Sequence, residues 1–294
     1  GSSLFVTAAT AVALAVAMLA ATPVVVAAEP LVVVVMDPLS KPLSCDCVRG
    51  YAQREYKLLA AHLESELGRQ VNLVWFESLA EALEQTGGKA DLVIGKHSVV
   101  LADEQATSHA LQPLARLTGK DGDTTQKGLV VVRRDDAATT LASLGGYRFL
   151  LGPTDAEEKS SAAEAALNKA GVTLDGKRER FGACSEAASA LLHLPEDVKA
   201  AAVISSYAEP LLEGCGSINK GDLRVVGETA PVDFITAFVA EEMEAGNRER
   251  LLTGLITAGT KPEVLIGMET LAGFLPWEDD TAALKKKTAT PPNR

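Results

Sequence analysis

Residues 147–171 read YRFLLGPTDAEEKSSAAEAALNKAG, and this stretch holds a strand, a loop and a helix in succession. Apart from Arg148, residues 147–151 are apolar or aromatic, which is typical of a buried strand, and Gly152-Pro153 ends the run. Residues 160–170 are rich in alanine, and Gly171 is a usual helix stop. A buried strand followed directly by a helix favours a βαβ unit and a parallel sheet.

The same alternation extends in both directions along the chain. The sequence predicts further strands at 31–36, 71–75, 91–94, 178–181 and 200–204, and helices at 51–67, 78–83 and 185–194. A stretch without long helices separates the first run, residues 31–94, from the second, residues 147–204. We therefore predict an α/β protein with two lobes, each a mostly parallel sheet flanked by helices.

These runs also predict how the chain divides. We expect the following segments: 29–131 as the first part of lobe 1, 132–226 as lobe 2, 227–280 as the return to lobe 1, and 281–294 as a disordered tail. Two extended crossings should join the lobes and bend as hinges. We place these hinges near Val131 and near residues 226–231.

Composition excludes one class of partner. The chain has 294 residues, of which 47% are hydrophobic, so it can bury a large core. It carries 39 acidic against 28 basic residues, and the resulting charge of -11 repels nucleic-acid phosphates. The basic run at residues 285–287 lies in the polar tail and is typical of a solvated end. We expect no nucleic-acid partner.

The N-terminal segment indicates export. Residues 4–28 carry no charge, and the small residues Ala27 and Ala28 precede Glu29. This pattern predicts a signal peptide over residues 1–28 that is cleaved near Ala28, with a retained membrane anchor as the alternative. We therefore expect the mature protein in the periplasm.

Several stretches in a shared order resemble one family. They are YKLLAAHLESELGRQVNLV (56–74), ADLVIGKHSVVLA (90–102), QPLARLTGKDGD (112–123), KGLVVVRRDD (127–136), LASLGGYRFLLGPTDAEEKSSAAEAAL (141–167), CSEAASALL (184–192) and DVKAAAVISSYAEPLL (197–212). Over about residues 31–274, the chain resembles the phosphonate/phosphite-type solute-binding proteins of ABC transporters. The resemblance implies a type II periplasmic-binding fold and a monomer that captures a small anion for an ABC permease or a membrane sensor.

Ligands of open α/β sheets bind at the carboxyl ends of the strands, which selects five loops, at residues 37–51, 95–98, 154–161, 184–186 and 205–207. Lys96, His97 and Ser98 follow the strand at 91–94, where they would either contact an anion or face solvent. Ser205, Ser206 and Tyr207 follow the strand at 200–204. Ser185 opens the helix at 185–194, in a segment where the family has a Ser-His-Glu-like motif.

The third loop leads into the alanine-rich helix. Lys159, Ser160 and Ser161 lie near the helix N-terminus, where unpaired N–H groups favour an anion. The resemblance aligns them with the family's Ser/Thr cluster for phosphonate oxygens, while simple helix capping is the alternative. Glu157 and Glu158 precede them and would repel a multiply charged anion unless their side chains point away.

The cysteines leave three interpretations open. Cys45 and Cys47 would form a structural disulfide, bind a ligand or soft metal, or remain inert thiols. With Cys184 and His97, they would make a sulfur- and nitrogen-rich site for a soft metal or metalloid, which is our alternative function. A bridge from Cys184 to Cys215 is disfavoured, because we expect Cys184 at the cleft edge of its lobe and Cys215 at the opposite edge, farther apart than the roughly 6 Å that a disulfide tolerates between Cα atoms.

The sequence carries no signature of an enzyme. We find no nucleophile elbow, phosphate-binding loop, dinucleotide-binding fingerprint or zinc-protease motif. We therefore predict a binding protein without catalytic residues and, apart from the soft metal, without a cofactor.

Overall fold

The computed structural model describes residues 28–44, 48, 52–174 and 178–277. The expected signal peptide, the pair Cys45 and Cys47, and the expected tail lie outside these residues, apart from Ala28. Within the described part of the chain, no helix is both long enough and apolar enough to cross a membrane.

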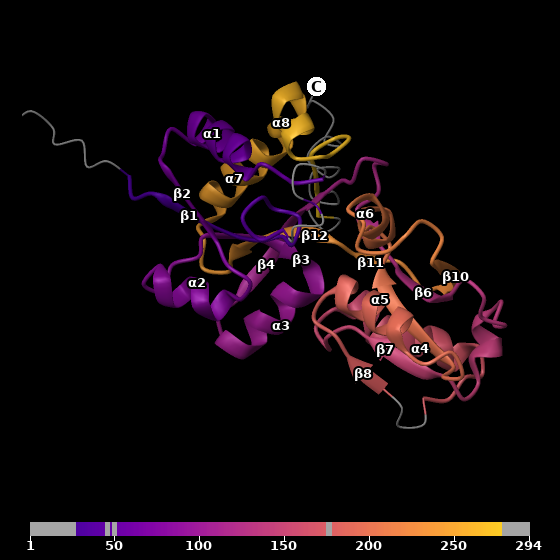
Figure 1. Cartoon of the computed structure of the whole chain (residues 1–294). Helices are drawn as coiled ribbons and strands as arrows, with labels where there is room; N and C mark the ends of the chain where they lie inside the picture. The colour runs from indigo at the N-terminus through magenta and orange to yellow at the C-terminus, as the bar shows by residue number, and fades with distance from the viewer. Residues whose placement is uncertain (1–27, 45–47, 49–51, 175–177, 278–294) are drawn as a thin grey trace, which may run out of the picture.

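The strands form two large sheets and one small one (Figure 1). The first sheet has the order β13-β4-β12-β3-β1-β2, with β1 (Leu31–Met36), β2 (Val71–Trp75), β3 (Leu92–Lys96), β4 (Leu111–Leu117), β12 (Ile235–Ala240) and β13 (Phe274–Pro276). The second has the order β10-β6-β9-β7-β8, with β6 (Gly128–Arg133), β7 (Arg148–Leu151), β8 (Arg178–Arg180), β9 (Ala200–Ser205) and β10 (Leu223–Glu228). The small sheet pairs β5 (Thr125–Gln126) with β11 (Val232–Asp233).

Helices cover both faces of each large sheet. Those of the first lobe are α1 (Tyr56–Leu67), α2 (Leu79–Gln85), α3 (His97–Thr107), α7 (Ala245–Thr257) and α8 (Pro262–Gly267). Those of the second are α4 (Ser161–Lys169), α5 (Cys184–His193) and α6 (Ala208–Gly214), with the 3-10 turns η2 (Leu141–Leu144) and η3 (Glu157–Lys159). The 3-10 turn η4 (Ala258–Thr260) joins α7 to α8. Two α/β lobes therefore lie side by side, as the sequence predicts (Figure 1).

Strand direction divides each sheet in two. β1 pairs in parallel with β2 and β3, and β7 pairs in parallel with β8 and β9. The strands that enter or return from the other lobe pair antiparallel: β12 with β3 and β4, and β6 with β9 and β10. The βαβ runs read from the sequence thus form the parallel half of each sheet.

Side-chain alternation along the strands builds two hydrophobic layers per lobe. In β1, Val33 and Val35 pack in the layer of α1 and α7, whereas Val32 and Val34 pack in the layer of α2 and α3. The second sheet follows the same rule, with α5 and α6 on one face and α4 on the other. Because both faces are covered, all residues of β1, β3, β9 and β12 are buried, as expected for inner strands of an α/β sheet.

The chain passes between the lobes in two crossings. The first runs through β5 and the second through β11, and these two short strands pair with each other. Val131 lies inside β6 and Val226 inside β10. The first expected hinge position therefore falls within the second sheet, and the second expected hinge, residues 226–231, begins within it. The segments that join the large sheets are residues 118–127 and 229–234. Hinge bending at the crossings stays a prediction.

Candidate functional site

A cavity of about 640 Å³ lies between the two lobes at the carboxyl ends of their strands. From the first lobe it is lined by Met36, Pro38, Leu39, Leu43, Val48, Glu77, Lys96 and Val99. From the second lobe it is lined by Pro153, Asp155, Ala156, Lys159, Gly182, Ala183, Cys184, Ser185, Glu186, Tyr207, Ala208, Leu211 and Leu212. The position agrees with the rule that ligands of α/β sheets bind beyond the carboxyl ends of the strands.

A buried ion pair joins the lobes at this cavity. Lys96 ends β3 of the first lobe, and its Nζ lies 2.5 Å from Glu158 Oε1, on the turn η3 of the second lobe. Ser205 Oγ, at the end of β9, donates to the same oxygen at 2.6 Å. Burial lowers the pKa of Lys96, and the Glu158 carboxylate opposes that shift. Two strand ends, one from each lobe, thus meet at one carboxylate.

Glycines determine where this carboxylate lies. A Cβ on Gly128 would come within 2.0 Å of the Glu158 backbone oxygen, and a Cβ on Gly152 within 2.5 Å of Lys159 Cβ. The turn η3 is therefore seated directly against β6 and the end of β7. The sequence interpretation treated Glu158 as a repulsive neighbour of the site. The structure instead turns it inward and buries it completely.

Lys159, the next residue, supplies a second buried cation. Its side chain lines the cavity and is only 6% exposed. Its Nζ lies 3.7 Å from Cys184 Sγ, and among the described residues it forms no ion pair. Cys184 begins α5, and its sulfur also accepts from the backbone N–H of Ser205 at 3.4 Å. A buried ammonium without a carboxylate partner is costly unless an anion compensates it.

Tyr207 forms part of the cavity wall. Its ring stacks on Phe234, with the centroids 5.1 Å apart. The guanidinium carbon of Arg54 lies over the Phe234 ring, 5.6 Å from its centroid. Burial, followed by the nearby Cys184 and Glu158, raises the pKa of Tyr207 well above its usual value. The phenol therefore stays protonated and can donate a hydrogen bond to an acceptor.

Lys96, Lys159, Ser185 and Tyr207 line the cavity, but other predicted residues have different roles. Ser98 Oγ donates to Asp155 O at 2.6 Å and accepts from Glu157 N at 3.2 Å, so it joins the lobes. His97 stacks on Trp277 and contacts Thr236 Oγ1 at 3.1 Å, outside the cavity lining.

The remaining predicted serines also lie outside the cavity lining. Ser160 Oγ donates to the backbone oxygens of Thr154 and Ala156, Ser161 is exposed, and Ser206 Oγ accepts from Lys127 N. Of the cluster expected to hold an oxyanion, Lys159 is thus the member that lines the cavity. The Ser160 hydroxyl thus bonds to the backbone of the preceding loop, and its side chain does not cap α4.

The thiols give the soft-metal interpretation no further support. Cys184 and Cys215 are free thiols, and Cys45 and Cys47 lie outside the described residues. Among the described residues, no group of three or more His, Cys, Asp or Glu side chains is arranged to hold a metal ion. His97 contacts Trp277, Phe238 and Thr236, whereas Cys184 contacts Lys159 and Ser205, so their surroundings differ.

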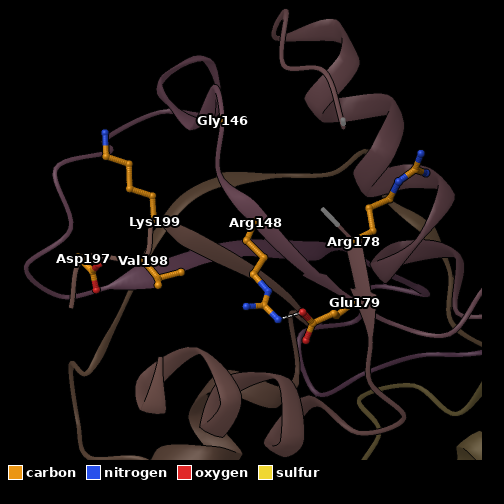
Figure 2. A pocket seen from close by; sticks show the side chains of 7 residues that line it. All are labelled: Gly146, Arg148, Arg178, Glu179, Asp197, Val198 and Lys199. Atoms are coloured by element: carbon orange, nitrogen blue, oxygen red, sulfur yellow. Dashed lines mark ion pairs between the residues drawn. The ribbon is translucent and has the colours of Figure 1, made fainter. Parts of the chain in front are cut away.

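A second hollow lies at the far end of the second lobe (Figure 2). It is lined by Gly146, Arg148, Arg178, Glu179, Asp197, Val198 and Lys199, with Arg148 paired to Glu179. These residues lie at the starts of β7 and β8 and just before β9. The hollow is therefore at the amino ends of the parallel strands, opposite to the end where ligands of such sheets bind.

Solved structures share this architecture at low sequence identity. XAC2383 from Xanthomonas citri bound to ATP is 17% identical, over 88% of this chain and 95% of that chain, with a TM-score of 0.64. A binding-protein component of an ABC phosphonate transporter from Pseudomonas aeruginosa is 12% identical, over 88% and 85%, with a TM-score of 0.61. PhnD1 from Prochlorococcus marinus in complex with methylphosphonate is 16% identical, over 89% and 99%, with a TM-score of 0.58.

These similarities confirm the type II periplasmic-binding fold. No match was found among curated proteins. The family model described as "ABC transporter, phosphonate, periplasmic substrate-binding protein" matches residues 51–282. This match covers both lobes and every side chain that lines the cavity from η3 onward. The chain therefore belongs to the phosphonate family of periplasmic substrate-binding proteins of ABC transporters.

Proposed function

We propose that this protein captures a small anion in the cavity between its lobes and presents it to an ABC permease. The observation that carries the proposal is Lys159, a buried ammonium at the cavity wall without an ion-pair partner among the described residues. Burial without compensation disfavours a charged group, so a bound anion would stabilise the closed arrangement of the lobes. The protein would act as an exported, periplasmic monomer and perform no chemistry on its ligand.

Neighbouring donors complete the anion site in this proposal. Ser185 lies in the first turn of α5 and lines the cavity, and so does Tyr207, at the start of α6 in the same lobe. The N-terminal end of the ten-residue helix α5 favours a negative charge, and its first N–H groups can donate to a ligand, apart from that of Ala183, which donates to Glu186 Oε2 at 3.2 Å. Binding therefore needs no cofactor, because hydroxyls, backbone N–H groups and one ammonium supply the contacts.

Thermal unfolding with added anions tests the proposal. A ligand that binds the folded state alone raises the melting temperature, by the equivalent of about 2.7 kcal/mol at one hundred times its Kd. We expect such a rise with at least one member of a panel of organic carboxylates, sulfonates, phosphonates and inorganic oxyanions. Lys159→Met should abolish it, and Lys199→Met, at the exposed far end of lobe 2, should retain it. A flat response across the panel would overturn the proposal.

Alkylation of cysteine gives an independent reading of where the anion binds. Cys184 lines the cavity beside Lys159, whereas Cys215 is exposed outside the cavity lining. A bound anion should slow the modification of Cys184 by iodoacetamide and leave that of Cys215 unchanged, as followed by peptide mass spectrometry. Equal protection of both thiols, or of neither, would place the ligand elsewhere.

A further inference from the structure

Glu158 already makes the contacts that a bound oxyanion would make. Its Oε1 accepts from the Lys96 ammonium at 2.5 Å and from the Ser205 hydroxyl at 2.6 Å, at full burial. A cation together with a hydroxyl is a typical donor set for a carboxylate, sulfonate or phosphonate group. The protein's own carboxylate thus occupies this donor set and neutralises Lys96.

The charges that remain favour a ligand with a single negative charge. Lys96 and Lys159 are the two buried cations at the cavity, and Glu158 compensates one of them. One positive charge is therefore left for the ligand. The second charge of a dianion would find no buried cation free to receive it among the described residues.

The outer lining adds to this discrimination. Glu77, Asp155 and Glu186 line the same cavity at exposed or half-buried positions, and all three are acidic. Their repulsion reaches across the mouth of the cavity, since screening at physiological salt has a length of about 8 Å. The repulsion acts twice as strongly on a dianion as on a monoanion of the same shape.

The walls favour an apolar body on the ligand. Aliphatic side chains contribute most of the remaining lining, namely Met36, Pro38, Leu39, Leu43, Val48, Val99, Pro153, Leu211 and Leu212. Small-molecule sites combine such apolar walls with a few polar groups that orient the ligand. Hydrophobic burial stabilises the complex in proportion to the apolar area removed from water.

We infer that Glu158 serves as a built-in anion, so that the pocket selects a singly charged organic anion with an apolar body over a doubly charged phosphonate. This inference rests on the proposed capture of an anion and specifies its class. It makes Glu158 a specificity-determining residue that acts through Lys96.

Matched pairs of ligands isolate the charge from the shape. The second pKa of an alkyl- or arylphosphonate lies above the value of about 6 for a phosphate ester, because carbon withdraws less electron density than an ester oxygen. Methyl-, hexyl- and phenylsulfonate therefore carry one charge throughout, whereas the corresponding phosphonates carry two at about pH 9 and one at about pH 5. Calorimetric titration of the wild-type protein should show the best-binding sulfonate at least about tenfold tighter than its phosphonate at about pH 9. The preference should shrink at about pH 5, where the two charges become equal.

Variants test whether Glu158 causes the preference. Glu158→Gln releases the charge of Lys96, so the sulfonate preference should fall by about tenfold or reverse. The double variant Lys96→Met/Glu158→Gln removes both charges, and it should return the ratio toward the wild-type value. This double variant also keeps the test decisive if the single variant folds poorly, because it leaves neither Lys96 nor Glu158 as an uncompensated buried charge.

The outcomes separate this inference from the proposed function. If a phosphonate binds the wild-type protein as tightly as its sulfonate at about pH 9, where the phosphonate carries two charges, the inference is overturned and anion capture stands. An unchanged ratio in Glu158→Gln also overturns it. If no sulfonate, phosphonate, sulfate or phosphate binds, anion capture itself fails, and the inference fails with it.

Discussion

Two buried ion pairs follow strand ends in this protein, and they differ in how completely they are satisfied. Asp37, directly after β1, uses both of its oxygens: Oδ2 accepts from Arg54 Nη1 at 2.8 Å and from the Tyr56 hydroxyl at 2.6 Å, while Oδ1 accepts from Leu39 N at 2.9 Å. Arg54 also donates to Met268 O at 3.2 Å. All these partners belong to the first lobe, so the pair holds the segment after β1 against α1 and α8.

The pair between the lobes is less complete. Glu158 Oε1 accepts from both Lys96 and Ser205, whereas its Oε2 is buried without a hydrogen-bond partner among the described residues. Buried polar atoms in native proteins are almost always satisfied, so an exception suggests a functional role. Burial alone therefore does not distinguish the roles of these charges. The pair Asp37–Arg54, in which both carboxylate oxygens accept hydrogen bonds, stabilises one lobe. The pair Glu158–Lys96, in which one carboxylate oxygen has no partner among the described residues, lies where a ligand and a second lobe must meet.

The largest expected effect comes from breaking the saturated pair, the fully hydrogen-bonded ion pair between Asp37 and Arg54. Arg54→Met leaves Asp37 buried without its cation and should lower the free energy of unfolding by about 3–5 kcal/mol. Urea unfolding at neutral pH measures this loss. Lys41→Met, which removes the exposed pair between Lys41 and Glu55, serves as the control and should change stability by less than about 1 kcal/mol. A similar small change for Arg54→Met would contradict a stabilising role for the saturated pair.

Breaking the interlobe pair should have a smaller effect, because among the described residues Lys96 donates to Glu158 alone, whereas Arg54 donates to both Asp37 and the Met268 backbone oxygen. Lys96→Met should lower the free energy of unfolding by about 2 kcal/mol. The double variant Lys96→Met/Glu158→Met should return to within about 1 kcal/mol of the wild type, since apolar replacements often match a buried ion pair. Denaturant unfolding of the wild type, both single variants (Lys96→Met and Glu158→Met) and the double variant completes the cycle. Additive losses in the double variant would show that the two charges do not act together.

A single added methyl group tests the seating of the turn η3. Gly152→Ala places a Cβ 2.5 Å from Lys159 Cβ, and such overpacking should cost about 1–3 kcal/mol. It should also weaken anion binding, because it displaces Lys159. Gly145→Ala meets open space and is the matched control. Calorimetry and unfolding should therefore separate the two variants, and equal behaviour would mean that Lys159 needs no fixed position.

The smallest expected effect concerns pH. Burial lowers the pKa of His97 below its ordinary value of 6.5, while Asp233 acts in the opposite direction and Arg116 in the same one. The folded state therefore holds His97 neutral, and the unfolded state binds its proton more readily. This contribution to stability is complete above about pH 6.5 and is lost as the pH falls toward the folded-state pKa. His97→Gln should flatten that part of the stability profile, and an unchanged slope would contradict the assignment.

Much of the fold could be predicted, because its inner strands are continuous apolar runs. β1, β3, β7 and β9 lie close to their predicted positions, since both faces of each are covered by helices. β4 and β13 were not predicted. Pro113 interrupts the pattern of β4, and β13 has only three residues, so tertiary pairing rather than local sequence determines both strands.

The site could be predicted only in part. Strand ends indicated Lys96, Lys159, Ser185 and Tyr207, all of which line the cavity. The inward direction of Glu158 could not be deduced, because it depends on close contact with Gly128, which lies 30 residues earlier in the chain. Likewise, His97 was expected in a loop at the cleft, but it begins α3 and packs its ring against aromatic side chains. Contacts between distant segments, rather than local pattern, determine these directions.

The pairing of β5 with β11 has a mechanical consequence. Val232 pairs with Gln126 and Asp233 with Thr125, so the two connecting strands form one narrow antiparallel ribbon. Neither strand can rotate alone without breaking this ladder. Any change in the angle between the lobes would therefore involve both connections together, because they share this ladder.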